Sequence, residues 1–517
     1  MGLSRVWSTT DKDGPTSHIN EKGIGWIIAA IFIIGETAGG GMIALSYALT
    51  SMGLIPGLIL LLLCSGFSLY TALELCWTWK IMQNRWPEYR GDHCRKPYGE
   101  MAYRTIGRKM RSFIAFMICI TQIGFATVLV LLAAKNLSIL LHFFFSLDIN
   151  QCYLILIVGL AVWPATMLPS PMHFWQAALF SAGSSTFAVI LVVIGLAHDA
   201  PVCSQDVPHE EPNLLKAFMA FGTFVFAFGG HATLPTIQHD MRKPAHFVHS
   251  VVLAIIFCTC LYLCIAVGGY LVYGSTVGEA IIPSLQIKWI QQTVNLMIAV
   301  HVITTIVIVM SPPIQQVEAL LKVPHKFGIK RFLVRTVLFW FVIFIGLSIP
   351  HFGPVLDLVR FRNSPLIGHI ILKTTITFQI GASTMVLMTL ILPPIFYLSI
   401  RTQEVIWLQE NEKNEDVAEP HHERVTFKEI LRLTPKPILA LNAAVLIFGI
   451  IGGTLSTITS LIRLADSDMA APCYWQYFTK GLPFSGDNTG SVSCCGTYRN
   501  LTVSGQSPIG YCSHPDF

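Results

Sequence analysis

One carboxylic acid stands beside three consecutive glycines within a long apolar stretch. The run is Gly35-Glu-Thr-Ala-Gly-Gly-Gly-Met42, inside residues 26–50. If this stretch crosses a bilayer, the acid costs about 2.5–3.5 kcal/mol at mid-membrane and needs a cavity or a partner. Because such an acid can bind and release a proton, we interpret Glu36 as an ion-coupling residue. The alternative is a structural acid that caps free N–H groups and never titrates.

A second apolar stretch is interrupted in the same way. It reads Phe224-Val-Phe-Ala-Phe-Gly-Gly-His231, with Pro235 four residues later. Consecutive glycines weaken a helix, and a membrane tolerates exposed backbone only where the chain lines a cavity. The sequence therefore predicts two broken helices that line a binding site.

Four more residues are candidates for ion coupling. His231 is predicted to orient the second unwound segment, with a packing histidine as the alternative. His301, Thr304 and Thr305 lie together in a later apolar stretch. We hypothesise that the two hydroxyls join carbonyls of the first broken helix around a sodium ion. The alternative is that each threonine bonds its own backbone, as threonine in membrane helices often does.

Composition places the chain in a membrane. Its 517 residues are 53% hydrophobic and only 12% charged, with a mean hydropathy of +0.60. Soluble domains carry about 25% charged residues. A soluble enzyme, a disordered scaffold and a nucleic-acid binder are therefore excluded, and the net charge of +5 is modest. The composition indicates an all-α integral membrane protein.

Eleven stretches approach the ~20 apolar residues that a helix needs to cross the hydrocarbon core. They are residues 26–50, 53–79, 112–141, 152–168, 174–197, 214–236, 247–273, 288–318, 334–356, 380–400 and 438–462. With the N-terminus inside, cytosolic segments hold 25 of the 34 Lys and Arg residues, as the positive-inside rule requires. Eleven spans then place the C-terminus outside.

The chain accordingly divides into five parts. They are a cytosolic tail (1–25), a ten-helix core (26–400), a cytosolic linker (401–437), an eleventh helix (438–462) and a Cys-rich extracytosolic tail (463–517). The last part also carries the glycosylation sequon Asn500-Leu-Thr, which suits an oxidising, extracytosolic compartment. The disulfide candidates are Cys152, Cys203, Cys473, Cys494, Cys495 and Cys512. Their pairing stays open, and free thiols on a floppy tail are the alternative.

The two interruptions open successive blocks of five helices. Interrupted helices at matching places in two halves indicate an inverted-repeat transporter with its site at the bilayer midplane. Free N–H groups attract a carboxylate, whereas free carbonyls hold an ammonium group. Such a site suits the zwitterion of an amino acid, with glycine amides in one break and carbonyls in the other. The predicted substrate-binding residues are Thr37, Ala38, Gly39, Gly40, Gly41, Phe226, Ala227, Phe228 and Gly229.

Three segments carry a wider resemblance. They are Asn20-Glu-Lys-Gly-Ile-Gly-Trp26, Gly35-Glu-Thr-Ala-Gly-Gly-Gly-Met-Ile-Ala-Leu45 and Gly229-Gly-His-Ala-Thr-Leu-Pro-Thr-Ile-Gln-His-Asp-Met-Arg-Lys-Pro244. Together they resemble the amino acid/auxin permease family, over residues 20 to 462. The resemblance implies a leucine-transporter-like 5+5 inverted repeat plus an eleventh helix, and amino-acid transport coupled to protons or sodium. One departure is Ser46, where family members often have proline.

Residues 359–379 interrupt this resemblance. The family joins the flanking segments directly, whereas this chain inserts 21 residues there. The codons for Val359-Arg-Phe and Thr-Phe-Gln379 can resemble a splice donor and a splice acceptor. We hypothesise a translated intron; an outer loop insertion is the alternative, since a loop of this length costs little entropy. Sequencing of the transcript decides between them.

The sequence thus predicts a proton-coupled secondary amino-acid transporter that works by alternating access, in the plasma membrane or an endolysosomal membrane. A sodium-coupled transporter and an amino-acid-binding sensor that does not transport are the alternatives. The sequence shows no HExxH motif, paired intramembrane aspartates or Ser/His dyad that would indicate an enzyme. The expected partners are the amino acid, a proton or sodium, and the lipid bilayer. No cofactor, metal site or nucleic acid is implied, and no oligomer signal stands out.

Overall fold

Helices dominate the computed structural model. It describes residues 21–503 except 22, 91–93, 95, 169–174, 205–206, 208, 210, 212–213, 279, 325–327, 350–383, 412–423, 466–471, 481–491, 494 and 496–501. The insertion 359–379, the sequon at Asn500, and Cys494 and Cys512 lie outside the described residues, as does most of the tail 1–25.

The first interrupted stretch folds as two short helices joined at the glycines. α2 (Trp26–Thr37) is separated by residues 38–41 from a 3-10 turn (Met42–Ala44) and α3 (Leu45–Met52). The two halves are bent by 52°. Apolar residues build α2. The helix ends just before the glycine run, where no side chains shield the backbone.

The rest of the first half is built from continuous helices. They are α4 (Leu54–Arg85), a 3-10 turn (Pro87–Tyr89), α5 (Pro97–Thr105), α6 (Arg108–Phe145), α7 (Gln151–Val162) with a 3-10 turn (Trp163–Met167), and α8 (Trp175–Cys203).

The second half opens with the other broken helix. α9 (Leu214–Ala227) ends before the Gly229–Gly230 pair, and α10 (Leu234–His239) begins after it. Gly230 has φ +122°, a conformation that residues with a Cβ rarely adopt. Pro235 occupies the first turn of α10, where its missing N–H has no intrahelical partner to lose.

The remaining elements complete the chain. They are 3-10 turns at Pro244–His246, Gly274–Thr276 and Ile282–Ser284, α11 (Phe247–Tyr273), α12 (Lys288–Leu320), α13 (Ile329–Ser348), a π-helical turn (Leu387–Ile391), α16 (Leu392–Asn411), α17 (Phe427–Leu433), α18 (Lys436–Ala465), α19 (Cys473–Lys480), and the antiparallel strands β1 (Val492–Ser493) and β2 (Thr502–Val503).

The predicted spans coincide with apolar helices. Within the described ranges, eight helices are long and apolar enough to cross a membrane, and the bent pair α2–α3 supplies a ninth span. Two shorter apolar segments, Gln151–Met167 and Lys216–Ala227, stand where the fourth and sixth spans are predicted. Glycine runs therefore mark where the first and sixth spans break.

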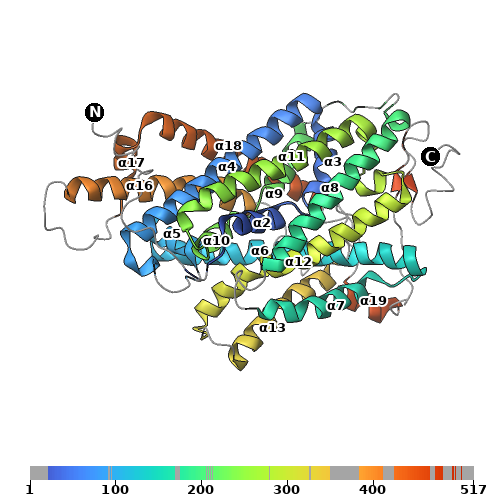
Figure 1. The fold of residues 1–517 in the computed structure, drawn as a ribbon, viewed down its shortest axis with the longest axis horizontal. Coiled ribbons are helices and arrows are strands. Elements are labelled where there is room, and N and C mark those ends of the chain that lie inside the picture. Colours follow the sequence, from blue (N-terminus) through green and yellow to red (C-terminus); the bar gives the residue numbers. More distant parts are fainter. Residues whose placement is uncertain are drawn as a thin grey trace.

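The broken helices lie in the middle of the bundle. α2 packs against α8, α11 and α12, and α7 and α13 lie together along one side (Figure 1). The linker helix α17 and the tail helix α19 lie at opposite ends of the bundle (Figure 1).

The segments that flank the two breaks also pair directly. Ile24, just before α2, forms a parallel bridge with Met241, just after α10. The Ile24 amide lies 3.0 Å from the Asp240 carbonyl, and the Arg242 amide lies 2.8 Å from the Ile24 carbonyl. The two broken spans are therefore joined outside the breaks as well.

Two disulfides attach the tail to the helical core. Cys152 at the start of α7 pairs with Cys473 of α19, and Cys203 at the end of α8 pairs with Cys495. Four of the six candidate cysteines therefore form disulfides. Within the described residues, the tail is therefore attached at two points, to α7 and to α8.

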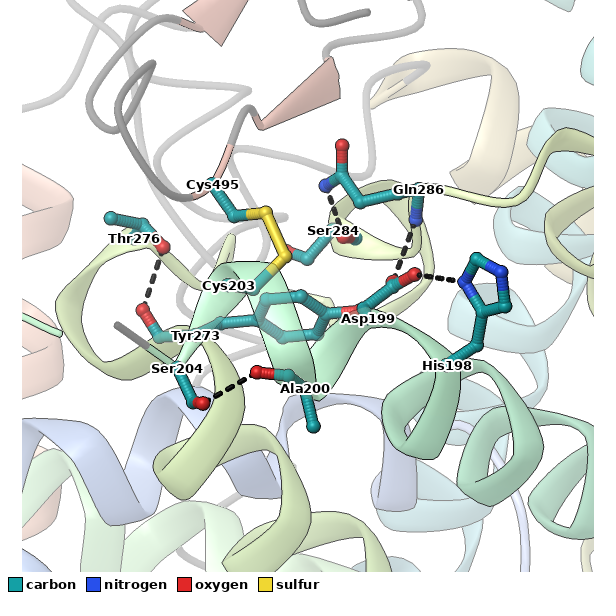
Figure 2. The surroundings of a disulfide bond; sticks show 10 residues. All are labelled: His198, Asp199, Ala200, Cys203, Ser204, Tyr273, Thr276, Ser284, Gln286 and Cys495. Carbon is teal, nitrogen blue, oxygen red and sulfur yellow. Dashed lines mark hydrogen bonds and ion pairs between the residues drawn. A yellow bond between two sulfur atoms is a disulfide. The ribbon is translucent and has the colours of Figure 1, made fainter. Parts of the chain in front are cut away.

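The second disulfide lies beside a buried carboxylate. Figure 2 shows Cys203–Cys495 next to Asp199, which is fully buried. The Asp199 carboxylate accepts hydrogen bonds from the Tyr273 hydroxyl (2.6 Å) and from the backbone amide of Gln286 (3.0 Å). These bonds fix the ends of α8 and α11 and the chain before α12 at the point where the tail is attached.

We expect Cys152→Ser to lower the free energy of unfolding by about 2–4 kcal/mol, because the disulfide restricts the unfolded chain. It links cysteines 321 residues apart. The measurement is the Tm of the purified protein in detergent without reductant. Cys260→Ser is the matched control, because Cys260 is an exposed, free cysteine on α11. Equal Tm values for the two variants would contradict the prediction.

Candidate functional site

The first break, residues 38–41 between α2 and the turn that begins at Met42, leaves two glycine amides without a hydrogen-bond acceptor among the described residues. α2 ends at Thr37, and the Ala38 amide still bonds a carbonyl of that helix. The Gly39 amide donates to the Thr37 carbonyl at 2.8 Å. Within the described residues, no acceptor is bonded to the amides of Gly40 and Gly41. Two of the three predicted glycine donors are therefore available to a ligand.

The second break, residues 228–233 between α9 and α10, leaves one carbonyl without a hydrogen-bond donor among the described residues. The Phe226 carbonyl accepts the Gly229 amide at 3.0 Å, and the Ala227 carbonyl accepts a side-chain hydroxyl from α11. No donor in the described part of the chain bonds the Phe228 carbonyl. Of the three carbonyls predicted to hold an ammonium group, that of Phe228 is the one without a partner.

The two breaks touch each other. The Thr37 hydroxyl lies 3.4 Å from the Gly229 carbonyl. A Cβ built on Gly41 would lie 2.9 Å from the Cα of Ala227. Since that atom is backbone and cannot rotate away, only glycine at position 41 allows this close approach.

Glu36 connects the first break to the second. Its side chain is 3% exposed, and its Oε2 accepts a hydrogen bond from the Thr233 hydroxyl, which also lies 2.8 Å from the Gly230 carbonyl. Its Oε1 is buried with no partner among the described residues. Gln122 of α6 faces the same carboxyl group, and its amide nitrogen is likewise buried.

A hydroxyl cluster joins α2, α8 and α12. The Ser181 hydroxyl lies 2.6 Å from the Gly35 carbonyl and 2.7 Å from the Thr305 hydroxyl. The Thr305 hydroxyl lies 3.1 Å from the same carbonyl. Small residues such as Ser181 are typical of helix packing in membranes, but here the serine also bonds the last turn of the first half-helix.

His301 lies directly against the first break. Its Nδ1 is 2.6 Å from the Ser185 hydroxyl and 3.0 Å from the Ser181 hydroxyl. Its Nε2 would lie 2.5 Å from a Cβ built on Gly39. The absence of a side chain at Gly39 therefore makes room for the imidazole ring.

Two other predicted residues lie outside this cluster. The Thr304 hydroxyl bonds the carbonyls of Val300 and His301 in its own helix, both at 2.9 Å, so only Thr305 of the threonine pair reaches the first broken helix. The Nε2 of His231 lies 3.0 Å from the Ser68 carbonyl and 3.1 Å from the Thr71 hydroxyl. His231 thus fixes the second break to α4.

Sequence reasoning misses three residues at the site. Thr233 bonds Glu36, Gln122 faces the same carboxyl, and Tyr262 of α11 donates to the Ala227 carbonyl. Thr233 stands two residues after His231, inside the quoted motif. For Gln122 and Tyr262, the signal is a hydrogen-bonding side chain inside an apolar span, which is costly unless it has a partner.

The membrane-spanning part is helical, and its first and sixth spans break at matching positions and touch at the breaks. This is the architecture of a secondary transporter. The chain belongs to the transmembrane amino acid transporter protein family, whose family model matches residues 22–360. The match confirms the family resemblance, and it ends at the start of the inserted segment.

Curated relatives include two Arabidopsis thaliana proteins. Lysine histidine transporter-like 6 is 26% identical, over 68% of this chain and 80% of the relative. Amino acid transporter AVT1B is 25% identical, over 72% of this chain and 64% of the relative. Vacuolar amino acid transporter 4 of Saccharomyces cerevisiae is 27% identical over 44% of this chain, and the match spans about a third (32%) of that relative.

Solved transporter structures share the fold. MhsT in complex with L-phenylalanine superposes with a TM-score of 0.52 at 11% identity, covering 85% of this chain and all of MhsT (100%). Mhp1, a nucleobase-cation-symport-1 family transporter, also gives 0.52, at 10% identity, covering 90% of this chain and 96% of Mhp1. At such identities the likeness shows the fold alone, and it confirms the predicted leucine-transporter-like architecture.

Proposed function

We propose that the protein is a proton-coupled secondary amino-acid transporter that binds its substrate where the two breaks meet. The observation that carries this proposal is a pair of complementary open groups. Among the described residues, the amides of Gly40 and Gly41 are free in one break, and the carbonyl of Phe228 is free in the other. Amides bind the carboxylate of an amino acid and a carbonyl binds its ammonium group. Thr37 and Gly229 bond each other beside these groups.

Protonation of Glu36 changes the hydrogen bonding between the breaks. Thr233 has one hydroxyl hydrogen, but both Glu36 Oε2 and the Gly230 carbonyl lie within its reach. A protonated carboxyl donates to Thr233, which then donates to Gly230, so the Thr233 hydroxyl and the Gly230 carbonyl both accept a hydrogen bond. An ionised carboxylate takes the hydrogen of Thr233, leaves Gly230 without it and buries a charge. We infer that this difference couples proton binding to movement of the second break.

Sodium coupling is the second candidate, and the hydroxyl cluster favours it. The Gly35 carbonyl, the Ser181 hydroxyl and the Thr305 hydroxyl converge within hydrogen-bonding distance of one another. Hard cations prefer oxygen ligands. In the present arrangement these oxygens bond each other, so a cation would have to replace those hydrogen bonds.

Uptake into proteoliposomes tests the proposal independently of which cell membrane holds the protein. The panel includes lysine and histidine, after which one of the Arabidopsis relatives is named. Uptake is measured at acidic and neutral outer pH, with sodium present or replaced. Acid-stimulated, sodium-independent uptake is the expected result.

Two other outcomes would contradict the proposal. Sodium dependence would contradict proton coupling and favour the hydroxyl cluster. Binding without uptake would indicate a sensor. The form lacking residues 359–379 is assayed beside the full chain, so that an effect of the inserted segment is recognised as such.

A further inference from the structure

One tyrosine hydroxyl connects the two breaks. Tyr262, on α11, is fully buried. Its hydroxyl lies 2.6 Å from the Thr37 carbonyl and 2.8 Å from the Ala227 carbonyl. Thr37 is the last residue of α2, and Ala227 is the last residue of α9. A side chain from a third, unbroken helix therefore bonds the C-terminal ends of both broken helices.

These two helix ends need a hydrogen-bond donor. The last four carbonyls of a helix have no N–H partner in that helix, and they carry the negative end of its dipole. The Thr37 carbonyl also accepts the Gly39 amide, but the Ala227 carbonyl has only Tyr262 among the described residues. Two negative helix ends thus converge in the interior, and the tyrosine places a donor between them.

The ring of Tyr262 is held by the second break itself. Its centroid lies 5.1 Å from that of Phe228, in an edge-to-face arrangement. Phe228 directly follows Ala227 and carries the open carbonyl that we propose for the substrate ammonium group. Tyr262 therefore contacts both the bonded carbonyl and the residue that presents the open one.

We propose that Tyr262 is a positioning residue, whose hydroxyl holds the ends of α2 and α9 at the separation that the substrate zwitterion requires. The effect on transport rests on the proposed function, whereas the effect on the two breaks rests on the geometry alone. A hydroxyl has one hydrogen for two carbonyls. When either break moves, the bond can pass to the other carbonyl, so the connection restrains the breaks without locking them.

The variant Tyr262→Phe removes the hydroxyl and keeps the ring. Tyr270→Phe is the matched control, because Tyr270 lies on the same helix and its ring stacks on His209, outside both breaks. A net hydrogen bond is worth up to a factor of about ten in an equilibrium. We expect Tyr262→Phe to speed hydrogen–deuterium exchange about tenfold at the hydrogen-bonded amides of the two breaks, and to raise the KM for uptake about tenfold. These amides are those of Ala38, Gly39, Phe228, Gly229 and Thr233. Tyr270→Phe should change neither.

Two results would overturn the inference. One is unchanged exchange in both breaks of Tyr262→Phe. The other is a lower protein level with unchanged exchange and unchanged KM, which would show that the hydroxyl serves folding only. The exchange measurement needs no transport. If the wild-type protein moves no amino acid, the proposed function fails, while the exchange rates still decide the role of Tyr262.

Discussion

Glu36→Gln is expected to abolish proton-driven accumulation of amino acids and to leave exchange of amino acids across the membrane intact. Glutamine has nearly the same shape and keeps an oxygen for the Thr233 hydroxyl, but it cannot bind or release a proton. One pH unit is worth about 1.4 kcal/mol per proton, which supports accumulation of about tenfold by a one-proton symporter. We expect the wild type to approach that ratio and the variant to stay near equal concentrations.

The measurement uses proteoliposomes with the membrane voltage clamped at zero and the outer pH lower by one unit. Exchange is followed as uptake of labelled amino acid against trapped unlabelled amino acid. Glu74→Gln is the matched control, because Glu74 is also fully buried but has Tyr70 and Asn442 as its neighbours. Accumulation by Glu36→Gln would contradict the coupling role. Loss of accumulation in Glu74→Gln alone would move that role to the second carboxylate.

Local composition explains why the breaks could be predicted. A helix ends where consecutive glycines leave the backbone without side chains to shield it. The position of such an end depends only on neighbouring residues in the sequence. The glycines at 39–41 fall between α2 and the turn that begins at Met42, and the pair at 229–230 falls between α9 and α10. The apolar spans follow from the same kind of local pattern.

The partners across the site could not be predicted, because they depend on packing between distant segments. Thr233 lies 197 residues from Glu36 in the sequence, and Tyr262 lies 225 residues from Thr37. Neighbouring residues of one type also differ: the Thr305 hydroxyl bonds its own helix and also the Gly35 carbonyl of the first broken helix, whereas the Thr304 hydroxyl bonds carbonyls of its own helix. That difference is set by the rotation of α12 within the bundle, which the sequence pattern does not specify.

Gly41→Ala is expected to impair uptake far more than Gly40→Ala. A Cβ on Gly41 would lie 2.9 Å from the Cα of Ala227 and 3.2 Å from a ring carbon of Phe226. A Cβ on Gly40 would meet only the end of the Leu132 side chain, at 3.4 Å, which is ordinary contact. Overpacking costs about 1–3 kcal/mol. At position 41 that cost falls on the contact between the breaks, so we expect the KM to rise by about fivefold to a hundredfold.

Both variants keep the backbone N–H, so neither removes an amide donor. A difference between them in uptake therefore reports the close approach of the two breaks. Uptake kinetics at matched protein level give the KM, and the Tm in detergent reports any general loss of stability. If the substrate needs both breaks in contact, Gly41→Ala raises the KM while Gly40→Ala stays near the wild type. Equal KM values would mean that the substrate binds without that contact. The site would then lie on the glycine amides of the first break alone, and the carbonyl of Phe228 would have no part in it.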